Sequence, residues 1–453
     1  MKKTFPRSCC FIFFGLAILL FSNQAHSQQN NSSWKAGVGS VEITPSESIW
    51  MGGYAARDHP SEGVRHSVWA KALAIEDRSG KLAVLVTADL LAFRKILSDK
   101  IRTRLRDEFG LSKDQIILNS SHTHTGPETD YARFQFQLSK TESNKIQQYA
   151  NRVEKQVVEM VGNAIKSLEP VTLSSENGVT RFQVNRRNNK EAQINAQTEL
   201  NGPNDYAVPV IKVEDQKGNV KALLFGYACH PTVLSDYRIS GDYAGFAQLE
   251  LEKLYPGTTA LFFQGAGADQ NPLPRRTIPL ARKYGKELAA AVESVLEEEM
   301  KPLAAQLKTA YSEVELGLNE PPSNQVLEKM IKESSGHYQR WAKMMYEKVK
   351  NKEVDTSYPY PIQIWKLGDQ FMIALGGEPV VDYSIKLKTQ YGKELFVLGY
   401  SNDVMAYIPT RTVLNEGGYE GATSQIAFGH PGTWKPTLET EIFSRINEMM
   451  AKL

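Results

Sequence analysis

The chain has 453 residues, with 53 Lys and Arg against 51 Asp and Glu, and 41% of its residues are hydrophobic. This nearly neutral balance argues against a general nucleic-acid binder, and a chain of this length buries a large core. It has three cysteines, and Cys229 alone lies beyond the first ten residues. A mature chain without those residues has no internal disulfide, so its stability must come from its core.

The N-terminal residues have the pattern of a secretory signal peptide over residues 1–27. Three basic residues within the first seven precede an apolar run from Cys9 to about Phe21, and small residues follow from Ala25. The run is too short to span a bilayer with margin. We expect cleavage near Ser27, a disordered linker over residues 28–33, and export to the periplasm or the extracellular space. An uncleaved N-terminal anchor is the alternative.

From Trp34 onward, apolar runs rich in β-branched residues alternate with amphipathic stretches. This predicts one mixed α/β domain over residues 34–453, with layered sheets flanked by helices. Residues 68–76 and 81–88 are predicted to form a hairpin across a turn-like Asp-Arg-Ser-Gly. Further strands are predicted at 115–119, 171–179, 208–213, 221–227, 259–264, 307–316, 362–365, 371–375 and 396–399. Helices are predicted at 93–109, 140–167, 246–254 and 279–299.

The stretch 322–350 is helical in pattern and rich in charge, and it carries Trp341, Met344 and Met345. Two interpretations remain open. It is either an inserted helical hairpin that covers a site, or a surface helix with one buried stripe.

The segment Asn119-Ser-Ser-His-Thr-His-Thr-Gly-Pro127 is the strongest candidate site. A predicted strand leads into it, and the Gly-Pro pair ends the element. Two histidines at i and i+2 face the same side of an extended backbone, so we expect His122 and His124 to point into one cleft at a strand end. Imidazole is a common metal ligand, although a His-x-His pair alone is equally consistent with a structural role.

Two further strand ends carry residues suited to the same site. His230 follows the apolar run Leu223–Cys229, and Glu378 follows Phe371–Leu375 and two glycines. A buried carboxylate is costly unless it is paired or bound to a metal. Two histidines and a glutamate form a ligand set that leaves an open position on zinc for water. A core role for His230, with a satisfied hydrogen bond, is the alternative.

A glycine-rich run, Gly265–Pro272, follows the predicted strand at 259–264. Gly265 and Gly267 permit a tight turn whose exposed N–H groups lie near a substrate. The run lacks the Lys-Ser/Thr of a phosphate-binding loop, and the chain has no Gly-x-Ser-x-Gly elbow. These absences count against a nucleotide site and an ordinary serine esterase. Asp242, at the start of a helical stretch, is interpreted as a helix N-cap.

Taken in order, these pieces resemble the neutral/alkaline (non-lysosomal) ceramidase family. The resemblance spans most of the mature chain, and its motifs are Ala36–Pro45, Met51–Tyr54, Thr87–Leu90, Ser121–Pro127, Asn185-Arg186, Ala228–Thr232, Gly241-Asp242, Gly377-Glu378, Ser401–Thr410 and Tyr419–Gly421. It implies a ceramidase-like catalytic domain with one catalytic Zn²⁺, held by two histidines, a glutamate and a tyrosine. The matching ligands are His122, His230, Glu378 and Tyr407, with Tyr419 as the alternative tyrosine.

The resemblance also implies roles for residues around the metal. Arg186 matches an arginine near the substrate, where it binds a carbonyl or an anionic group; a surface salt bridge is the alternative. His124, beside a metal ligand, is expected to orient a group or relay a proton.

Two departures from the family pattern bear on the chemistry. Ceramidases carry Gly-Asp-Val-Ser-Pro-Asn with its serine as the catalytic nucleophile, whereas this chain has Asn271 in the serine position. An amide side chain cannot be that nucleophile, but it can donate to a developing oxyanion. The chain also ends at residue 453, whereas family members continue into an additional C-terminal β-rich domain.

We therefore expect an exported, zinc-dependent amidohydrolase with a small-molecule or lipid substrate, no nucleic-acid partner and, for a lipid, peripheral contact with a membrane. One alternative is a metal-dependent esterase or amidase acting on a glycan-derived or other small substrate, which a shallow polar cleft would favour. The other is an inactive binding protein that kept the fold, which would be favoured if His122, His230 and Glu378 did not converge.

Overall fold

The computed structural model describes Met1 and residues 34–131 and 138–453. The chain divides into two units, Met1–Asn31 and Ser32–Leu453, and the fold described below is that of the second. Apart from Met1, the predicted signal peptide and linker lie outside the described residues. Among the residues that are described, no helix combines the length and apolar character needed to cross a membrane.

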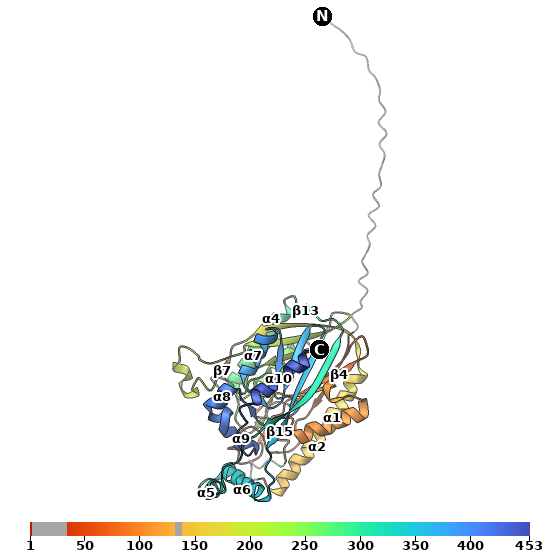
Figure 1. Ribbon diagram of the computed structural model, residues 1–453. Coiled ribbons are helices and arrows are strands. Elements are labelled where there is room, and N and C mark those ends of the chain that lie inside the picture. The colour runs from red at the N-terminus through yellow and green to blue at the C-terminus, as the bar shows by residue number, and fades with distance from the viewer. Residues whose placement is uncertain (2–33, 132–137) are drawn as a thin grey trace. The chain divides into compact units, whose positions relative to one another are not determined.

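A large mixed sheet forms the centre of the second unit (Figure 1). Its strands pair in the order β11-β9-β8-β6-β1-β3-β4-β5, and β13 pairs with β6. They are β1 (Trp34–Glu42), β3 (Trp69–Glu76), β4 (Leu82–Ala88), β5 (Ile116–Ser120), β6 (Glu169–Val179), β8 (Ala207–Asp215), β9 (Val220–Tyr227), β11 (Thr259–Gln264) and β13 (Lys301–Pro302). The predicted hairpin is confirmed, because β3 and β4 pair antiparallel.

A second sheet has the order β14-β15-β16-β18. Its strands are β14 (Leu307–Gly317), β15 (Ser357–Leu367), β16 (Gln370–Leu375) and β18 (Phe396–Leu398). Three two-stranded pairs complete the sheets: β10 (Arg238–Ile239) with β2 (Gly63–Val64), β12 (Gln270–Pro272) with β7 (Gln183–Asn185), and β17 (Glu378–Pro379) with β19 (Tyr407–Ile408).

Helices cover the outer faces of both sheets. Residues of α1 and α2 share one apolar cluster with β3, β4 and β5, and residues of α3 and α4 share another with β8, β9 and β11. The inner face of the large sheet packs on the second sheet, which α7 and α10 cover from the other side. The longer helices are α1 (Lys95–Phe109), α2 (Lys140–Lys166), α3 (Asp242–Leu254), α4 (Ile278–Leu296), α7 (Val381–Tyr391) and α10 (Leu438–Met450).

Shorter helical segments are η1 (Lys113–Gln115), η2 (Glu191–Ala196), α8 (Arg411–Glu416), η3 (Tyr419–Thr423) and α9 (Ser424–Phe428). The mixed, layered architecture predicted from the sequence is confirmed. Gly110, predicted to end α1, has the left-handed conformation (φ 71°) of a helix C-cap.

The two edge strands of the large sheet, β5 and β11, come together beside the second sheet. The Asn119 side chain on β5 accepts a hydrogen bond from Gln264 N on β11 (2.8 Å) and donates to Gly399 O just beyond β18 (2.8 Å). Since β4 and β5 are parallel, as are β9 and β11, several carboxyl ends of strands meet here.

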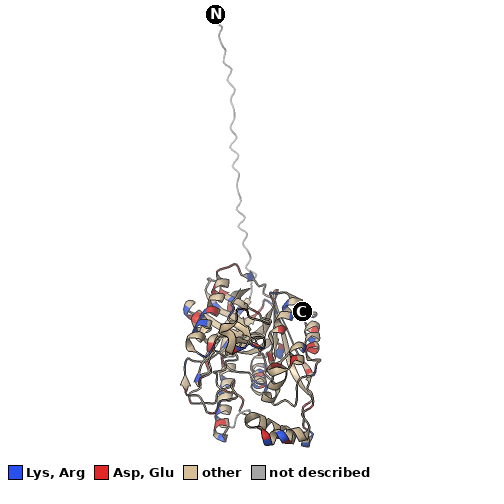
Figure 2. Cartoon of the chain, turned by 90° about the vertical axis from the view of Figure 1, so that its left-hand side faces the viewer, with Lys and Arg blue, Asp and Glu red and all other residues tan. Residues whose placement is uncertain are grey.

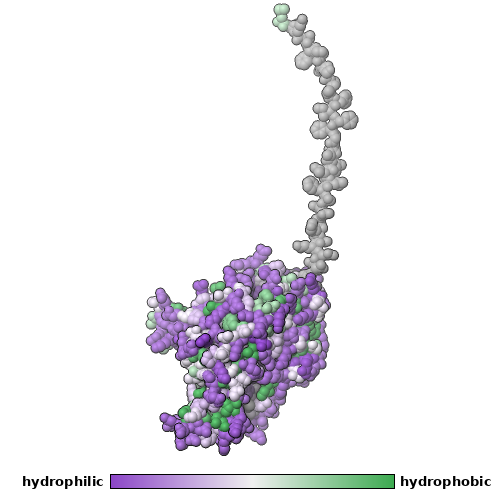
Figure 3. Space-filling view, in the orientation of Figure 1, coloured by the Kyte–Doolittle hydropathy of each residue, from purple (hydrophilic) through white to green (hydrophobic). Residues whose placement is uncertain are grey.

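The charged stretch 322–350 contains two helices, α5 (Asn324–Glu333) and α6 (Gly336–Asn351). Leu327, Trp341 and Met345 form a small buried cluster between them. Positions occupied by Lys, Arg, Asp and Glu are interspersed along these helices (Figure 2). The face seen in Figure 3 is mostly hydrophilic, with hydrophobic side chains gathered just above these helices. The buried stripe agrees with one interpretation; that the hairpin is an insertion remains a prediction.

We predict that Gly37→Ala destabilises the domain, because the new Cβ would lie 2.0 Å from Ala164 O in α2. Overpacking of this kind costs about 1–3 kcal/mol, so the thermal unfolding midpoint should fall. Ser40→Ala, at an exposed position on the same strand, is the matched control and should change stability by less than about 0.5 kcal/mol. Equal midpoints for the two variants would contradict the close packing of β1 on α2.

Candidate metal centre

Three strand ends deliver three polar side chains to one buried point. His122 follows β5, His230 follows β9 and Glu378 follows β16, each within three residues of the strand. Glu378 Oε2 lies 3.3 Å from His122 Nε2 and 3.3 Å from His230 Nε2. All three residues are at most 3% exposed. The convergence predicted from the sequence is thus present.

Hydrogen bonds fix which ring nitrogen of each histidine faces this point. His122 Nδ1 lies 2.7 Å from Leu91 O, and His230 Nδ1 lies 2.8 Å from Gly267 O. A carbonyl accepts, so each Nδ1 donates a proton there and each ring turns its Nε2 toward Glu378. Burial lowers the pKa of His230 to about 4, so this ring is neutral at ordinary pH.

His122, His230 and Glu378 form a group that we call the acceptor set, and the Glu378 carboxylate has no hydrogen-bond donor within it. Its Oε2 atom is buried and has no partner with hydrogen-bond geometry, although two imidazole nitrogens are within ion-pair distance. Burial raises the pKa of this carboxyl, but His122 and His230 outweigh burial and hold the pKa well below its usual range. An ionised oxygen between two nitrogen lone pairs is the arrangement that a cation stabilises.

His124 lies beside this set, but not for the reason that the sequence indicated. His124 Nε2 is 3.2 Å from His122 Nε2, and His122, His124 and His230 offer ligand atoms within 4.8 Å of one another. The expected extended backbone is wrong: β5 ends at Ser120, and His122 has φ 61°. A left-handed residue, rather than strand alternation, brings the two rings together.

The ring of His124 is held tightly and keeps one free nitrogen. Its Nδ1 is buried without a hydrogen-bond partner. A Cβ on Gly53 would lie 2.6 Å from this ring, and the Tyr54 ring meets it edge-on. Burial, followed by His122 and His230, lowers the pKa of His124 well below its usual value, so the ring is neutral.

Of the two candidate tyrosines, Tyr407 lies at the histidines. Its hydroxyl is 3.5 Å from His230 Nε2 and accepts a hydrogen bond from Arg186 Nη2 (3.1 Å). Tyr419 is half exposed and packs edge-on against the Tyr407 ring. Burial, reinforced by Glu378, raises the pKa of Tyr407 well above its usual range.

Arg186 is partly buried and forms an ion pair with the buried carboxylate of Glu420. Its Nε donates to Glu420 Oε1 (2.7 Å), and Glu420 also receives Arg187 Nη1 (2.8 Å). Burial lowers the pKa of Arg186, but Tyr407 and Glu420 outweigh burial and raise it well above the usual value. Glu420 was given no role from the sequence, although it lies in one of the family motifs.

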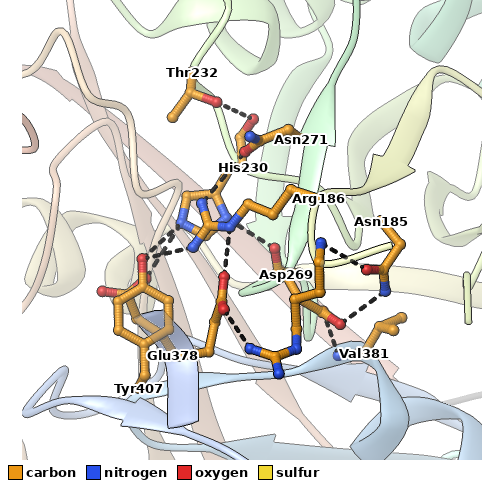
Figure 4. A network of polar contacts seen from close by, with 12 residues as sticks. Asn185, Arg186, His230, Thr232, Asp269, Asn271, Glu378, Val381 and Tyr407 are labelled. Atoms are coloured by element: carbon orange, nitrogen blue, oxygen red, sulfur yellow. Dashed lines mark hydrogen bonds and ion pairs between the residues drawn. The ribbon is translucent and has the colours of Figure 1, made fainter. Parts of the chain in front are cut away.

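Asn271 and Asp269 connect this arginine to the rest of the centre (Figure 4). Asn271 is buried on β12, and its Oδ1 lies 3.4 Å from Arg186 Nη1. The Asp269 carboxylate accepts from Asn185 Nδ2 (2.9 Å) and from Val381 N (2.9 Å). The Asp269 carboxylate therefore links Asn185, which precedes Arg186, to Val381, which follows Glu378 by three residues.

The glycine-rich run packs against the segment that carries His230. Gly265 N donates to Tyr227 O (3.0 Å), which corrects the expectation of an exposed amide there. A Cβ on Gly267 would lie 2.6 Å from Cys229 N. Neither glycine lines the pocket beside His122. Their substrate-binding role stays a prediction, while the structure shows Gly267 O holding the His230 ring.

Asp242 is not a helix N-cap, since Gly241 occupies that position. The buried Asp242 carboxylate instead accepts from Leu234 N (2.8 Å) and Val233 N (3.3 Å), in the loop after His230. Asp242, the first residue of α3, has φ 53°, and this left-handed backbone lets its side chain extend to the loop. Sequence reasoning missed it because the partner loop is not recognisable from local pattern.

A pocket of about 160 Å³ opens beside the centre. Its lining includes two of the three acceptor residues, His122 and Glu378, but not His230. Other lining residues are His124, Tyr407, Tyr419, His337, Tyr338, Leu91 and Arg94. The first turn of α6 therefore borders the pocket, and that this hairpin covers a site remains a prediction.

The chain resembles ceramidases in both sequence and structure. The sequence model of the family described as "Neutral/alkaline non-lysosomal ceramidase, N-terminal" matches residues 34–272. Neutral ceramidase 2 of Arabidopsis thaliana is 24% identical over 287 residues, which is 61% of this chain and 36% of that protein. The neutral ceramidase of Drosophila melanogaster is 25% identical over 235 residues, 50% of this chain and 33% of that protein. The chain thus spans about a third of the length of these relatives.

Solved structures share the fold. The crystal structure of neutral ceramidase from Pseudomonas aeruginosa superposes with a TM-score of 0.70 and 19% identity, covering 90% of this chain and 72% of that one. A structure described as ceramidase complexed with C2 gives a TM-score of 0.68 and 17% identity, covering 90% and 73% of the two chains.

We predict that the metal-stripped protein loses stability as pH falls from about 6.5 to about 4. The unfolded imidazole of His230 takes up a proton near its usual pKa, whereas the folded one does so only near 4, so the unfolded state binds more protons in this window. The free energy of unfolding should fall by up to about 3 kcal/mol from this group. Urea titrations at several pH values give the free energy of unfolding as a function of pH. In His230→Gln this free energy should fall less steeply as pH decreases. The same pH dependence as in wild type would contradict the burial argument.

Proposed function

Because the chain belongs to the neutral/alkaline non-lysosomal ceramidase family, as its sequence predicted, we propose that it is an exported, metal-dependent hydrolase of amide bonds. The observation that carries the proposal is Glu378 Oε2, an ionised, buried oxygen 3.3 Å from each of two imidazole nitrogens and without a hydrogen-bond donor. The condition that would favour an inactive binding protein, ligands that fail to converge, is not met.

The donor set fits a zinc ion. His122, His230 and Glu378 would hold it through two nitrogens and one oxygen, and the Tyr407 hydroxyl lies next to His230 Nε2 (3.5 Å). These are ligand types that Zn²⁺ takes, and three protein ligands leave a position for water or substrate. When bound, such an ion would act as a Lewis acid and make water nucleophilic near neutral pH.

The surrounding residues have chemistry suited to amide hydrolysis. His124 Nε2 lies 3.2 Å from His122 Nε2, where it can orient a group or relay a proton. The Arg186 guanidinium, held by Glu420, donates to the Tyr407 hydroxyl and keeps a positive charge beside the reacting carbonyl. Asn271 directs its Oδ1 toward Arg186 and lines a neighbouring pocket with it, so an oxyanion-binding role for its amide stays a prediction.

A second candidate function is a metal-dependent esterase or amidase acting on a small substrate. The size of the pocket favours it, because about 160 Å³ beside the centre holds a short group rather than a long acyl chain. Asn271 in the family's serine position favours it too, since direct attack by water does not require an acyl-enzyme. The two candidates share the centre and differ in substrate.

We predict that the purified mature chain contains about one zinc per molecule and loses activity when a chelator removes it. His122→Ala and Glu378→Gln should each lower metal content and reduce kcat/KM at least about 1,000-fold, because an acceptor of the set is lost. Elemental analysis and hydrolysis of N-acyl substrates, with and without chelator, provide the measurements.

The matched control is His59→Ala, which removes an exposed histidine outside the centre. It should retain both metal and activity. Activity that survives chelation, or that survives His122→Ala, would overturn the metal-dependent mechanism.

We predict that short N-acyl substrates are cleaved faster than long-chain ones, measured as kcat/KM over a series of N-acyl amides and the corresponding O-acyl esters. The small pocket is the reason. A strong preference for long chains would instead support a ceramide-like lipid and reject the small-substrate candidate. Faster cleavage of the esters would assign the activity to an esterase.

A further inference from the structure

A second pocket of about 200 Å³ lies behind the wall of the first. Arg94 and Phe428 line both pockets, with the Arg94 guanidinium carbon 5.1 Å from the Phe428 ring centroid. Val404 lines the first pocket, whereas Asp403 and Met405, on either side of it, line the second. The two pockets are therefore compartments on opposite sides of one short wall.

The Asp403 carboxylate is the distinctive group of this second pocket. Asp403 is 6% exposed, and its Oδ2 accepts one hydrogen bond, from the Tyr358 hydroxyl (2.6 Å). Among the described residues it forms no ion pair, since nearby Lys95 pairs with Asp99 (3.1 Å). A buried carboxylate is an acceptor with room for several donors, and leaving that capacity unused is costly. The pocket thus offers an acceptor to whatever enters it.

The rest of the lining is partly charged and partly apolar. Of its cations, Lys95 pairs with Asp99 (3.1 Å), Lys100 donates to Asn151 Oδ1 (3.4 Å) and Arg94 lies in the wall. Ile96 and Leu97 from the start of α1, Ala150 from α2, and Met405 and Phe428 provide apolar walls. Burial raises the pKa of Asp403 to about 6, so the carboxylate is mostly ionised at neutral pH and would repel an anion. A molecule that fits has an apolar stem and a terminal hydrogen-bond donor.

Backbone bonds tie this carboxylate to the metal centre. Asp403 O accepts from Gly377 N (2.7 Å), the residue before Glu378, and Arg94 Nη1 donates to Val404 O (2.8 Å). The loop that carries Asp403 is thus fixed relative to Glu378. An arm that reaches Asp403 from a carbonyl at Glu378 would have to run beside the Arg94–Phe428 pair, which lines both pockets.

We propose that the second pocket is a substrate subsite for an arm that has a short apolar stem and ends in a hydroxyl or ammonium group, which donates to Asp403. The proposal rests on the proposed function, because it takes the metal centre as the place of cleavage. It extends that function by assigning the chemistry of the substrate at a distance from the reacting bond.

The test uses the purified mature chain and four N-methyl amides with acyl arms of equal length ending in methyl, hydroxyl, ammonium or carboxylate. Isothermal titration calorimetry should show the hydroxyl or ammonium arm binding about tenfold more tightly than methyl, equal to about 1.4 kcal/mol, and the carboxylate arm binding most weakly. Asp403→Leu should abolish the preference for a donor. Asp403→Asn should keep the fold and remove the penalty on the carboxylate arm.

The matched control is Asp107→Asn, an exposed aspartate of α1 that does not line the pocket. It should keep the wild-type order of affinities. The same order in Asp403→Leu, Asp403→Asn and wild type would overturn the subsite. The anilides of the same four acyl arms, assayed for hydrolysis, separate the two proposals: failure to cleave any of them counts against the proposed function, whereas the order of binding alone decides the subsite.

Discussion

The side chain of Asn119 joins the two edges of the large sheet and the second sheet at one point. It accepts from Gln264 N on β11 and donates to Gly399 O beyond β18. The amide is buried, so each of these bonds also satisfies a group that would be costly to leave unpaired. Because His122 and His230 follow the large sheet and Glu378 follows the second sheet, their convergence depends on this junction.

The centre that results is a concentration of acceptors. The Nε2 atoms of two imidazoles and a carboxylate oxygen face one another. The two Nδ1 protons are donated away from this point, to Leu91 O and Gly267 O. Such an arrangement is electrostatically unfavourable in the absence of a positive charge. Hydrogen bonds to Asp269 and Glu420 fix the segments next to His122, His230 and Glu378. The three acceptors therefore stay close together.

Strong local patterns made much of the fold and of the site predictable. Periodicity located most strands and helices, and three strand ends identified His122, His230 and Glu378. The backbone at His122 was predicted wrongly because a left-handed residue leaves no clear mark in the sequence. Partners such as Glu420, Gly53 and Asp242 were missed or misread, because their roles depend on contacts between segments that are distant in the chain. The tie between the two sheets at Asn119 has the same character, since an asparagine in a strand does not reveal which carbonyl it will meet.

The separation of the joined segments has a consequence for how the protein matures. Asn119 and its partner Gly399 are 280 positions apart, and Leu118 N and its acceptor Asn402 Oδ1 are 284 apart. Contacts of such high sequence separation form late, because loop closure must precede them. We therefore expect the acceptor set to form late in folding, after the two sheets have joined at Asn119. Metal binding would then follow folding, whereas in small zinc domains the ion itself drives folding.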